Sequence, residues 1–322
     1  MATPLSAEAL QAVHDDAVRR GWAGQLAEAE YLLREVVRAA PDDTLAQKHL
    51  AIVLLSRGNL REGAPLFESR LSLPRAEPAP NLPFPRWSGE PLDGKRVLIW
   101  PEQGFGDQIQ FARFAPVLQR RDCDVTLLCN LRLERLFRQS LDVRVIGTSG
   151  TVEFPDPDLW IWSNSLISAL VRDEADIPSA PYLHATPRRS SYRIGVAAVG
   201  NPAHGNDQHR SLPPELVSEL LSLPGCGSLL PEDTGARDFA DTAEIIAGLD
   251  LVISVDTSIA HLAGAMGKAC WILLPASGTD WRWMRNRDDS PWYPSATLLR
   301  QPTPADWRSV IDQVRERLQM RG

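Results

Sequence analysis

Apolar and small residues recur three and four positions apart through residues 6–73. This spacing gathers them on one face of a helix, so the pattern predicts helices there. The expected helices span 7–20, 26–40, 45–57 and 60–71. Gly24 and Gly58 stand 34 residues apart (58 − 24), which is the period of tetratricopeptide repeats. We expect an all-α repeat region over residues 1–78 that packs against the following chain, because two repeats rarely suffice alone.

Prolines are concentrated in residues 74–91, ahead of any strand-like pattern. Proline fixes φ and lacks an N–H donor, so this composition predicts a linker, which we place at 79–92. Phe84 and Trp87 within it indicate that the linker lies against a surface.

From residue 96 onward, short apolar runs alternate with helical stretches. This alternation is typical of parallel sheets with crossover helices, an α/β fold class. Two series indicate two Rossmann-type domains, at 93–189 and 190–322, facing each other across a cleft where strands end. The expected strands are 97–100, 125–129, 143–146, 159–162, 194–199, 251–255, 270–274 and 297–299. The expected helices are 108–119, 131–139, 214–223, 241–249, 258–266 and 305–319.

The loop EQGFGD at 102–107 joins the first strand to its helix. Gly104 and Gly106 allow a tight turn, and the helix start offers unpaired N–H groups. Ile109 replaces the third glycine of a dinucleotide fingerprint and no P-loop lysine is present, so neither motif is supported. Asp107 stands where an N-cap belongs; it either caps the helix or acts as a general base.

A second strand-to-helix junction, DLVISVDTSIAH at 250–261, delivers polar groups to a helix start. Asp256, Thr257 and Ser258 precede or begin the helix that contains His261. Hydroxyls and helix N–H groups together suit a diphosphate. The alternative is that these residues only cap the helix and that His261 is a packed core histidine.

Two further segments offer cleft residues. Residues 200–211 are polar and contain Arg210, which pairs with a phosphate or is a solvated loop arginine. Residues 280–293 are rich in tryptophan and arginine, which pack in a core or stack on a base or sugar. The possible further cleft residues are Gln103, Asn201, Asn206, Trp281 and Arg282.

Composition narrows the function classes. The chain has 322 residues, is 43% hydrophobic, and carries 34 basic against 41 acidic side chains, a formal charge of −7. This apolar content excludes a wholly disordered chain, and the acidic balance disfavours a nucleic-acid partner. Cys123 and Cys129 bracket a strand that holds them about 20 Å apart, too far for a disulfide.

The amino terminus, MATPLSAEAL, shows no signal-peptide pattern, and no apolar run approaches the roughly 20 residues of a membrane helix. We therefore expect a cytoplasmic protein without a transmembrane segment.

Three strings carry a family resemblance: PRWSGEPLDGKRVLIWPEQGFGDQIQFARFAP, GNPAHGNDQHRSLP and DFADTAEIIAGLDLVISVDTSIAHLAGAMGK. With them, the chain over residues 45–320 resembles bacterial proteins that join tetratricopeptide repeats to a glycosyltransferase module of the GT-B fold. The module is similar to glycosyltransferase family 9, the heptosyltransferases. The resemblance implies a GT-B-like pair of Rossmann-type domains preceded by the all-α repeat segment.

The resemblance also implies roles for individual residues. Asp107 matches the family's proposed general base, and Arg210 matches a basic residue that contacts the donor phosphate. The matching donor-diphosphate residues are Asp256, Thr257, Ser258 and His261. Family members are inverting and metal-independent, with a nucleotide-sugar as co-substrate and no other cofactor. The family architecture suggests a protein or glycan acceptor, such as flagellin, with the helical repeats as the protein-binding surface.

Two departures from the family pattern keep other functions open. Ser258 replaces a common glycine, and residues 223–241 are short for the strand, loop and helix expected there. The short segment motivates a rival hypothesis: a catalytically degenerate scaffold that binds a protein partner. A third hypothesis, another nucleotide-dependent α/β enzyme, is disfavoured by the missing glycine and lysine motifs.

Overall fold

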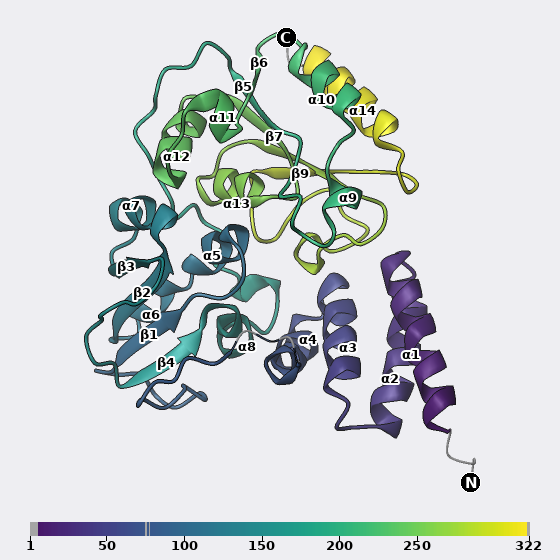
Figure 1. The fold of residues 1–322 in the computed structure, drawn as a ribbon, viewed down its shortest axis with the longest axis vertical. Coiled ribbons are helices and arrows are strands. Elements are labelled where there is room, and N and C mark those ends of the chain that lie inside the picture. Colours follow the sequence, from purple (N-terminus) through teal and green to yellow (C-terminus); the bar gives the residue numbers. More distant parts are fainter. Residues whose placement is uncertain (1–5, 75, 77, 321–322) are drawn as a thin grey trace. The chain divides into compact units, whose positions relative to one another are not determined.

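The computed structural model describes residues 6–74, 76 and 78–320. The chain forms two compact units (Figure 1). The helical unit comprises Met1–Pro80, Ile167–Ile177 and Pro275–Arg287. The α/β unit comprises Asn81–Leu166, Pro178–Leu274 and Asp288–Gly322. Residues 1–5 of the predicted repeat region, and 321–322 of the predicted final domain, lie outside the described residues.

The helical unit begins with four helices, each packed on the next. They are α1 (Ala7–Trp22), α2 (Leu26–Ala39), α3 (Thr44–Ser56) and α4 (Leu60–Phe67). The last predicted helix was too long, because the chain tightens after Phe67 into the 3-10 helix η1 (Glu68–Ser72). Apolar residues recurring at helical spacing form the core: Ala17, Ala29, Leu33, Leu50, Val53 and Leu54.

The glycines that suggested a repeat have the same conformation. Gly24 and Gly58 both have positive φ, +82° and +81°. Residues that carry a side chain rarely adopt this φ, so glycine suits both turns. The recurrence supports a helical repeat, and the tetratricopeptide identity stays a prediction.

Two segments that the sequence analysis placed in the α/β domains pack within the helical unit. In Pro275–Arg287, which contains η4 (Trp281–Trp283), the Trp281 ring lies 5.9 Å from the Phe67 ring. The Arg285 amide donates to the Ser56 carbonyl at 3.1 Å. The other segment, Ile167–Ile177, contributes Glu174, whose carboxylate pairs with Arg287 at 2.8 Å. The helical unit is therefore built from three separate stretches of chain.

The first sheet of the α/β unit has the order β3-β2-β1-β4, and every neighbouring pair is parallel. Its strands are β1 (Arg96–Trp100), β2 (Asp124–Asn130), β3 (Arg144–Thr148) and β4 (Leu159–Trp162). Part of the predicted linker joins this sheet: the Trp87 amide donates to the Trp160 carbonyl at 2.7 Å. Trp87 is buried, which confirms that this stretch lies against a surface.

The helices around the first sheet begin and end differently from the prediction. The helix expected at 108–119 starts earlier and divides into α5 (Phe105–Ala112) and α6 (Ala115–Gln119). Pro116 explains the division, because proline lacks an N–H and suits the first turn of a new helix. Helix α7 (Leu131–Ser140) follows β2 as expected.

The second sheet has the order β6-β5-β7-β8-β9 and is also entirely parallel. Its strands are β5 (Ile194–Ala197), β6 (Cys226–Ser228), β7 (Leu251–Val255), β8 (Cys270–Leu274) and β9 (Ala296–Arg300). Its helices include α10 (Pro214–Leu221), α12 (Phe239–Ala247), α13 (Ser258–Ala265) and α14 (Trp307–Gln319). The predicted α/β class with parallel sheets is confirmed.

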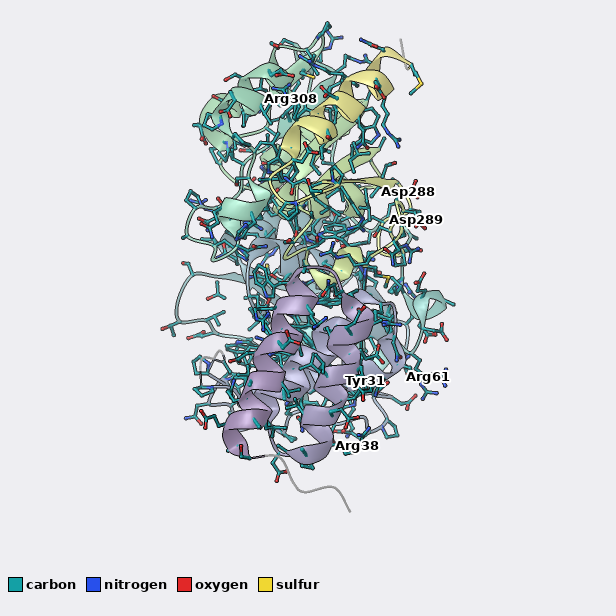
Figure 2. The ribbon with its side chains drawn as sticks, turned by 90° about the vertical axis from the view of Figure 1, so that its right-hand side faces the viewer. Tyr31, Arg38, Arg61, Asp288, Asp289 and Arg308 are labelled. Atoms are coloured by element: carbon teal, nitrogen blue, oxygen red, sulfur yellow. The ribbon has the colours of Figure 1, made fainter. Side chains whose placement is uncertain are left out.

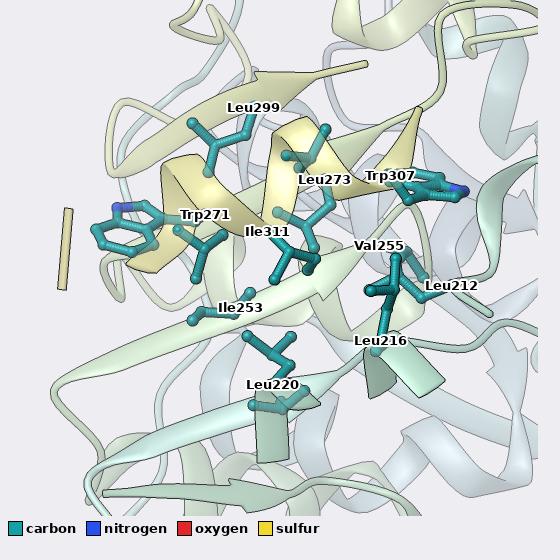
Figure 3. Close-up of a cluster of buried hydrophobic side chains, with 14 of the residues drawn as sticks. Leu212, Leu216, Leu220, Ile253, Val255, Trp271, Leu273, Leu299, Trp307 and Ile311 are labelled. Atoms are coloured by element: carbon teal, nitrogen blue, oxygen red, sulfur yellow. The ribbon is translucent and has the colours of Figure 1, made fainter. Parts of the chain in front are cut away.

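One hydrophobic cluster fixes how helices cover this sheet (Figure 3). Leu251, Ile253 and Val255 alternate along β7 and meet Leu216 of α10 and Ile311 of α14. Successive strand residues point to opposite faces, so α10 and α14 cover one face and α13, which also contacts β7, covers the other. Because all its strands are parallel, their carboxyl ends lie at one edge of the sheet.

The shortness predicted for residues 223–241 is seen in their elements, which are present but abbreviated. The segment contains β6, paired in parallel with β5, and the one-turn helix α11 (Pro231–Thr234). Gly235 at φ +69° ends that helix. A strand of three residues and a helix of one turn fit into this short segment, whereas longer elements would not. A further one-turn helix, α9 (Asp207–Arg210), lies in the stretch expected to be loop.

All four cysteines are free, as predicted for Cys123 and Cys129. Among the described residues, no helix is both long enough and apolar enough to cross a membrane.

Candidate active site

The loop after β1 brings Asp107 into the first turn of α5. The N-cap is Gly104, and Asp107 is the third helical residue rather than the N-cap that its position suggested. Its Oδ2 accepts a hydrogen bond from the Gly104 amide at 3.1 Å. Asp107 therefore holds the turn from inside the helix, as the third residue of a capping box does.

The residue before this turn has an unusual backbone. Gln103 has φ +63° and is exposed, and its carbonyl accepts from the Gln108 side-chain amide at 3.3 Å. A positive φ is unfavourable for a residue with a side chain and often marks a functional loop.

The loop after β7 is capped in the expected way. Thr257 is the N-cap of α13, and its hydroxyl accepts from the Ile259 amide at 3.3 Å. The same hydroxyl lies 3.2 Å from that of the buried Ser254. Ser258 begins the helix. The capping alternative is confirmed for Thr257, and it leaves the helix N-terminus positioned at the end of β7.

These two helix starts meet inside the α/β unit. A Cβ added to Gly106 would lie 2.9 Å from His261 Cδ2 and 3.7 Å from Ser258 Cα. Glycine at 106 is therefore required for the close approach of α5 to α13. The sequence analysis had given Gly106 a role only in the tight turn. The first turns of α5 and α13 lie together, and the positive ends of two helix dipoles favour an anion there.

His261 is a buried histidine with partners on two sides, as the packing alternative expected. It is 6% exposed. Its Nδ1 lies 2.9 Å from the Tyr293 hydroxyl, and its Nε2 lies 4.0 Å from Asp256 Oδ1. Because the His261 ring is buried and lies beside both Tyr293 and Asp256, its orientation is fixed.

Arg210 is not a solvated loop arginine. It ends α9, and its side chain is 12% exposed. One guanidinium nitrogen donates to the Asp256 carbonyl at 2.7 Å, and Nε donates to Asp207 Oδ1 at 3.1 Å. The first bond brings Arg210 to the carboxyl end of β7, beside the start of α13. The structure thus gathers Arg210, Asp256, Thr257, Ser258 and His261 with the first turn of α5.

Other predicted cleft residues have local structural roles. Asn201 is exposed and accepts from the Ala203 amide at 3.0 Å, closing a turn. Asn206 occupies the N-cap position of α9. Both lie in the segment that leads to Arg210.

Trp281 and Arg282 belong to the helical unit, where they pack as the core alternative expected. Trp281 is buried against Phe67. Arg282 is buried, pairs with Asp280 at 2.9 Å and lies over the Trp281 ring at 4.7 Å.

Arg113 and Tyr182, near His261, were not predicted, whereas Tyr293 belongs to the candidate segment 280–293. Arg113 is 2% exposed, donates to the Trp292 carbonyl at 2.8 Å, and lies over the rings of Tyr182 and Tyr293 at 5.0 and 4.7 Å. A sequence signal did exist for Tyr293: Gly264 follows His261 by one turn, and a Cβ there would lie 2.4 Å from Tyr293 Cγ. A glycine one helical turn after His261 leaves space for an aromatic ring to pack against the helix.

Burial sets the protonation state of these tyrosines. It raises the pKa of Tyr182, and it raises the pKa of Tyr293 well above its usual range. Desolvation disfavours the phenolate, so both hydroxyls keep their protons and can donate.

Ion pairs join the helices beside the two loops. Arg135 of α7 contacts Asp238 at 2.6 Å, Glu244 at 3.2 Å, and Asp241, on or next to α12. The Arg237 amide, followed by the Arg237 and Arg135 side chains, lowers the pKa of Asp241 to about 2. Hydrogen bonds to the charged form favour ionisation.

In the part of the chain that the structure describes, no three histidine, cysteine or carboxylate residues gather into a metal-binding group. Metal independence stays a prediction.

Comparisons with known proteins give two distant similarities, and no family model matches the chain. The chain is 26% identical over 349 positions to Protein FlbA of Caulobacter vibrioides, across 90% of this chain and 57% of that protein. It thus spans little more than half the length of this curated relative. A solved glycosyl transferase family 9 structure from Veillonella parvula matches with a TM-score of 0.46 and 12% identity, over 70% of this chain and 93% of that chain. The predicted family and site roles therefore rest on the sequence resemblance.

Proposed function

We propose that this protein is an inverting, metal-independent glycosyltransferase that uses a nucleotide-sugar. One observation carries the proposal: two helices from different parallel sheets begin side by side, as shown by the fit of Gly106 against His261. One start carries a carboxylate, Asp107, and the other carries hydroxyls and N–H groups suited to a diphosphate. The pair of parallel sheets agrees with a GT-B-like arrangement.

The proposed reaction is a single displacement. The acceptor hydroxyl oxygen bonds to the anomeric carbon while the bond from that carbon to the diphosphate oxygen breaks. Asp107 takes the hydroxyl proton, and the electron pair of the broken bond leaves on the diphosphate. One displacement inverts the anomeric configuration.

The leaving diphosphate is stabilised by groups that are already positioned. The start of α13 supplies N–H groups and the Ser258 hydroxyl, and Arg210 supplies a positive charge at the end of β7. Arginine has five N–H donors, and the bonds to Asp207 and Asp256 use two of them.

The acceptor is proposed to be a protein such as flagellin, or a glycan, with the helical repeats as a protein-binding surface in the cytoplasm. Tyr31 on α2 is 65% exposed, and Figure 2 shows it with Arg38 and Arg61 on the helical unit. Exposed aromatic and arginine side chains are enriched where proteins bind one another.

A degenerate scaffold is the second candidate function. The observation that favours it is that both key charged groups already have protein partners: Asp107 holds the Gly104 amide, and Arg210 pairs with Asp207. In a scaffold these contacts would be purely structural.

Thermal unfolding with UDP, GDP, ADP, CMP and CDP tests the proposal. Binding to the folded state alone adds about 2.7 kcal/mol of stability at a hundredfold excess over Kd. We expect one nucleotide to raise the Tm, with a smaller shift in Arg210→Ala. The control Arg308→Ala removes a surface ion pair with Glu219 and should keep the full shift. No shift with any nucleotide would favour the scaffold.

A further inference from the structure

The segment that contains Arg210 is attached to the ends of two neighbouring strands. β5 and β7 are neighbours at the point where the strand order reverses, since β6 lies on one side of β5 and β7, β8 and β9 follow on the other. Arg210 Nη1 donates to the Asp256 carbonyl after β7 at 2.7 Å. The Leu212 amide donates to the Ala198 carbonyl after β5 at 2.9 Å. Open α/β sheets bind ligands at such a reversal, at the carboxyl ends of the strands.

Asp207 binds a second nitrogen of the same guanidinium. Its Oδ1 accepts from Arg210 Nε at 3.1 Å, and its Oδ2 accepts from the Ser211 hydroxyl at 3.0 Å. The Ser211 oxygen in turn accepts from the Gly200 amide at 2.8 Å. The side chains of Arg210 and Asp207 are only 12% and 14% exposed. Both oxygens of this carboxylate are therefore engaged, and the ion pair is largely shielded from water.

The ion pair packs directly on the backbone of Gly200. A Cβ at position 200 would lie 2.2 Å from Asp207 Oδ1, and 2.8 and 2.9 Å from Arg210 Nε and Nη2. These separations are far shorter than van der Waals contact, so any side chain at this position would displace the pair. The guanidinium is planar, and bonds on two of its nitrogens together with packing on Gly200 fix that plane.

We propose that Asp207 is a positioning residue, which orients Arg210 toward the diphosphate of the nucleotide-sugar at the ends of β5 and β7. The identity of the ligand rests on the proposed function. Asp207 acts through its acceptor oxygen and not through its charge, because a negative charge opposes a bound diphosphate. The bonds to Asp207 and Asp256 leave three of the five N–H groups of Arg210 for phosphate oxygens. A guanidinium that is oriented in advance loses less conformational freedom on binding.

The orientation of Arg210 is tested first, without any ligand. In protein labelled with ¹⁵N-arginine, NMR measures the exchange of the Arg210 Nε proton with water, and Arg210→Ala identifies the resonance. We expect slow exchange in the unmodified protein and in Asp207→Asn, because an asparagine oxygen can still accept from Nε. Asp207→Ala removes the acceptor, so this protection should be lost. Equal exchange rates in Asp207→Ala and Asp207→Asn would overturn the proposal.

The effect on binding is tested by calorimetry with UDP, GDP, ADP, CMP and CDP. Asp207→Asn and Asp207→Ala form the informative pair, since both lack the charge and only asparagine keeps an acceptor for Arg210 Nε. We expect Asp207→Ala to bind about two- to tenfold more weakly than Asp207→Asn, because an unrestrained arginine must be ordered on binding. When each is combined with Arg210→Ala, the two variants should have the same Kd. A purely structural role of Asp207 would instead keep their difference.

A matched control separates this effect from the general loss of an aspartate that binds a nearby serine. At the start of α14, Asp306 accepts from the Ser309 hydroxyl at 2.6 Å and from the Ser309 amide at 3.1 Å. Asp306→Ala and Asp306→Asn should bind the nucleotide with the affinity of the unmodified protein.

The outcomes separate this proposal from the proposed function. Equal affinity of Asp207→Ala and Asp207→Asn refutes the positioning role and leaves the proposed function standing. Absence of binding by every nucleotide in the unmodified protein refutes the proposed function. The exchange of the Nε proton then still decides whether Asp207 orients Arg210.

Discussion

The loops after β1 and after β7 both lead from a parallel strand into an eight-residue helix, yet they differ in how firmly they are held. After β7, the Thr257 side chain caps the helix, Arg210 binds the Asp256 carbonyl, and His261 is buried. After β1, Gln103 and Gly104 are exposed, and Gln103 has a positive φ.

The difference matches what the proposed transfer reaction would require of each loop. Groups that stabilise a leaving diphosphate act best when they are positioned before the reaction, because no reorganisation is then needed. A general base must instead meet an incoming acceptor, so its loop has to be accessible. The comparison predicts that substitutions after β7 mainly lower stability, whereas those after β1 mainly lower activity.

Asp107→Asn should give the largest effect. If Asp107 is the general base, as proposed, its removal lowers the turnover rate by about 10²- to 10⁴-fold. Stability should change little, because the asparagine oxygen can still accept from the Gly104 amide. Turnover is measured with the nucleotide-sugar whose nucleotide raises the Tm. The exposed Asp156→Asn is the control for loss of a surface carboxylate. Unchanged turnover in Asp107→Asn would contradict the expectation that substitutions after β1 mainly lower activity.

Sequence reasoning found the loop after β7 because helix capping is local. The run Asp256, Thr257, Ser258 directly after an apolar strand is a helix-start signal within a few residues. The start of α5 was misplaced by three residues because Asp107 can cap from the N-cap or from the third helical position, and sequence alone does not distinguish them.

Contacts between distant segments were the part that sequence did not predict. Arg113 and Trp292 are 179 positions apart, and no local period links them. Strand β6 has three residues, too few for an alternating pattern to be recognised. The docking of Pro275–Arg287 in the helical unit likewise depends on tertiary packing, since tryptophans suit a core and a binding site equally.

Gly264→Ala tests the loop and helix that follow β7. The new Cβ would lie 2.4 Å from the Tyr293 ring carbon, so the ring has to move. Overpacking of this kind lowers stability by about 1–3 kcal/mol. On the β1 side, Gly104→Ser should be nearly neutral, since a Cβ there meets nothing closer than Asp107 Oδ2 at 3.7 Å and serine is a good N-cap. Urea unfolding measures both, and equal losses would break the comparison.

Asp241→Asn tests, through the pH dependence of stability, the ion pairs that lie beside the two loops. The pKa of Asp241 is about 2 in the folded protein against a usual 3.8, so ionised Asp241 stabilises the fold above about pH 4. That stability is lost as pH falls from about 4 to about 2. The variant should be less stable by about 1–2 kcal/mol at pH 6, and the difference should shrink over that window. Urea midpoints at pH 6, 4 and 3 measure it; a constant difference would contradict the assigned cause.

Gln103→Gly should give a small gain in stability, and it separates strain from function. Glycine accepts positive φ without a steric penalty, and allowing for its freer unfolded chain, we expect a gain of about 0.5–1 kcal/mol. Asp122→Gly is the matched control, being exposed with φ +57° outside the site, and should gain similarly. If the loop after β1 is strained for a purpose, only Gln103→Gly loses turnover while becoming more stable. If both variants gain stability and keep full turnover, the positive φ of Gln103 is a packing accident, and the open loop owes its role to Asp107 alone.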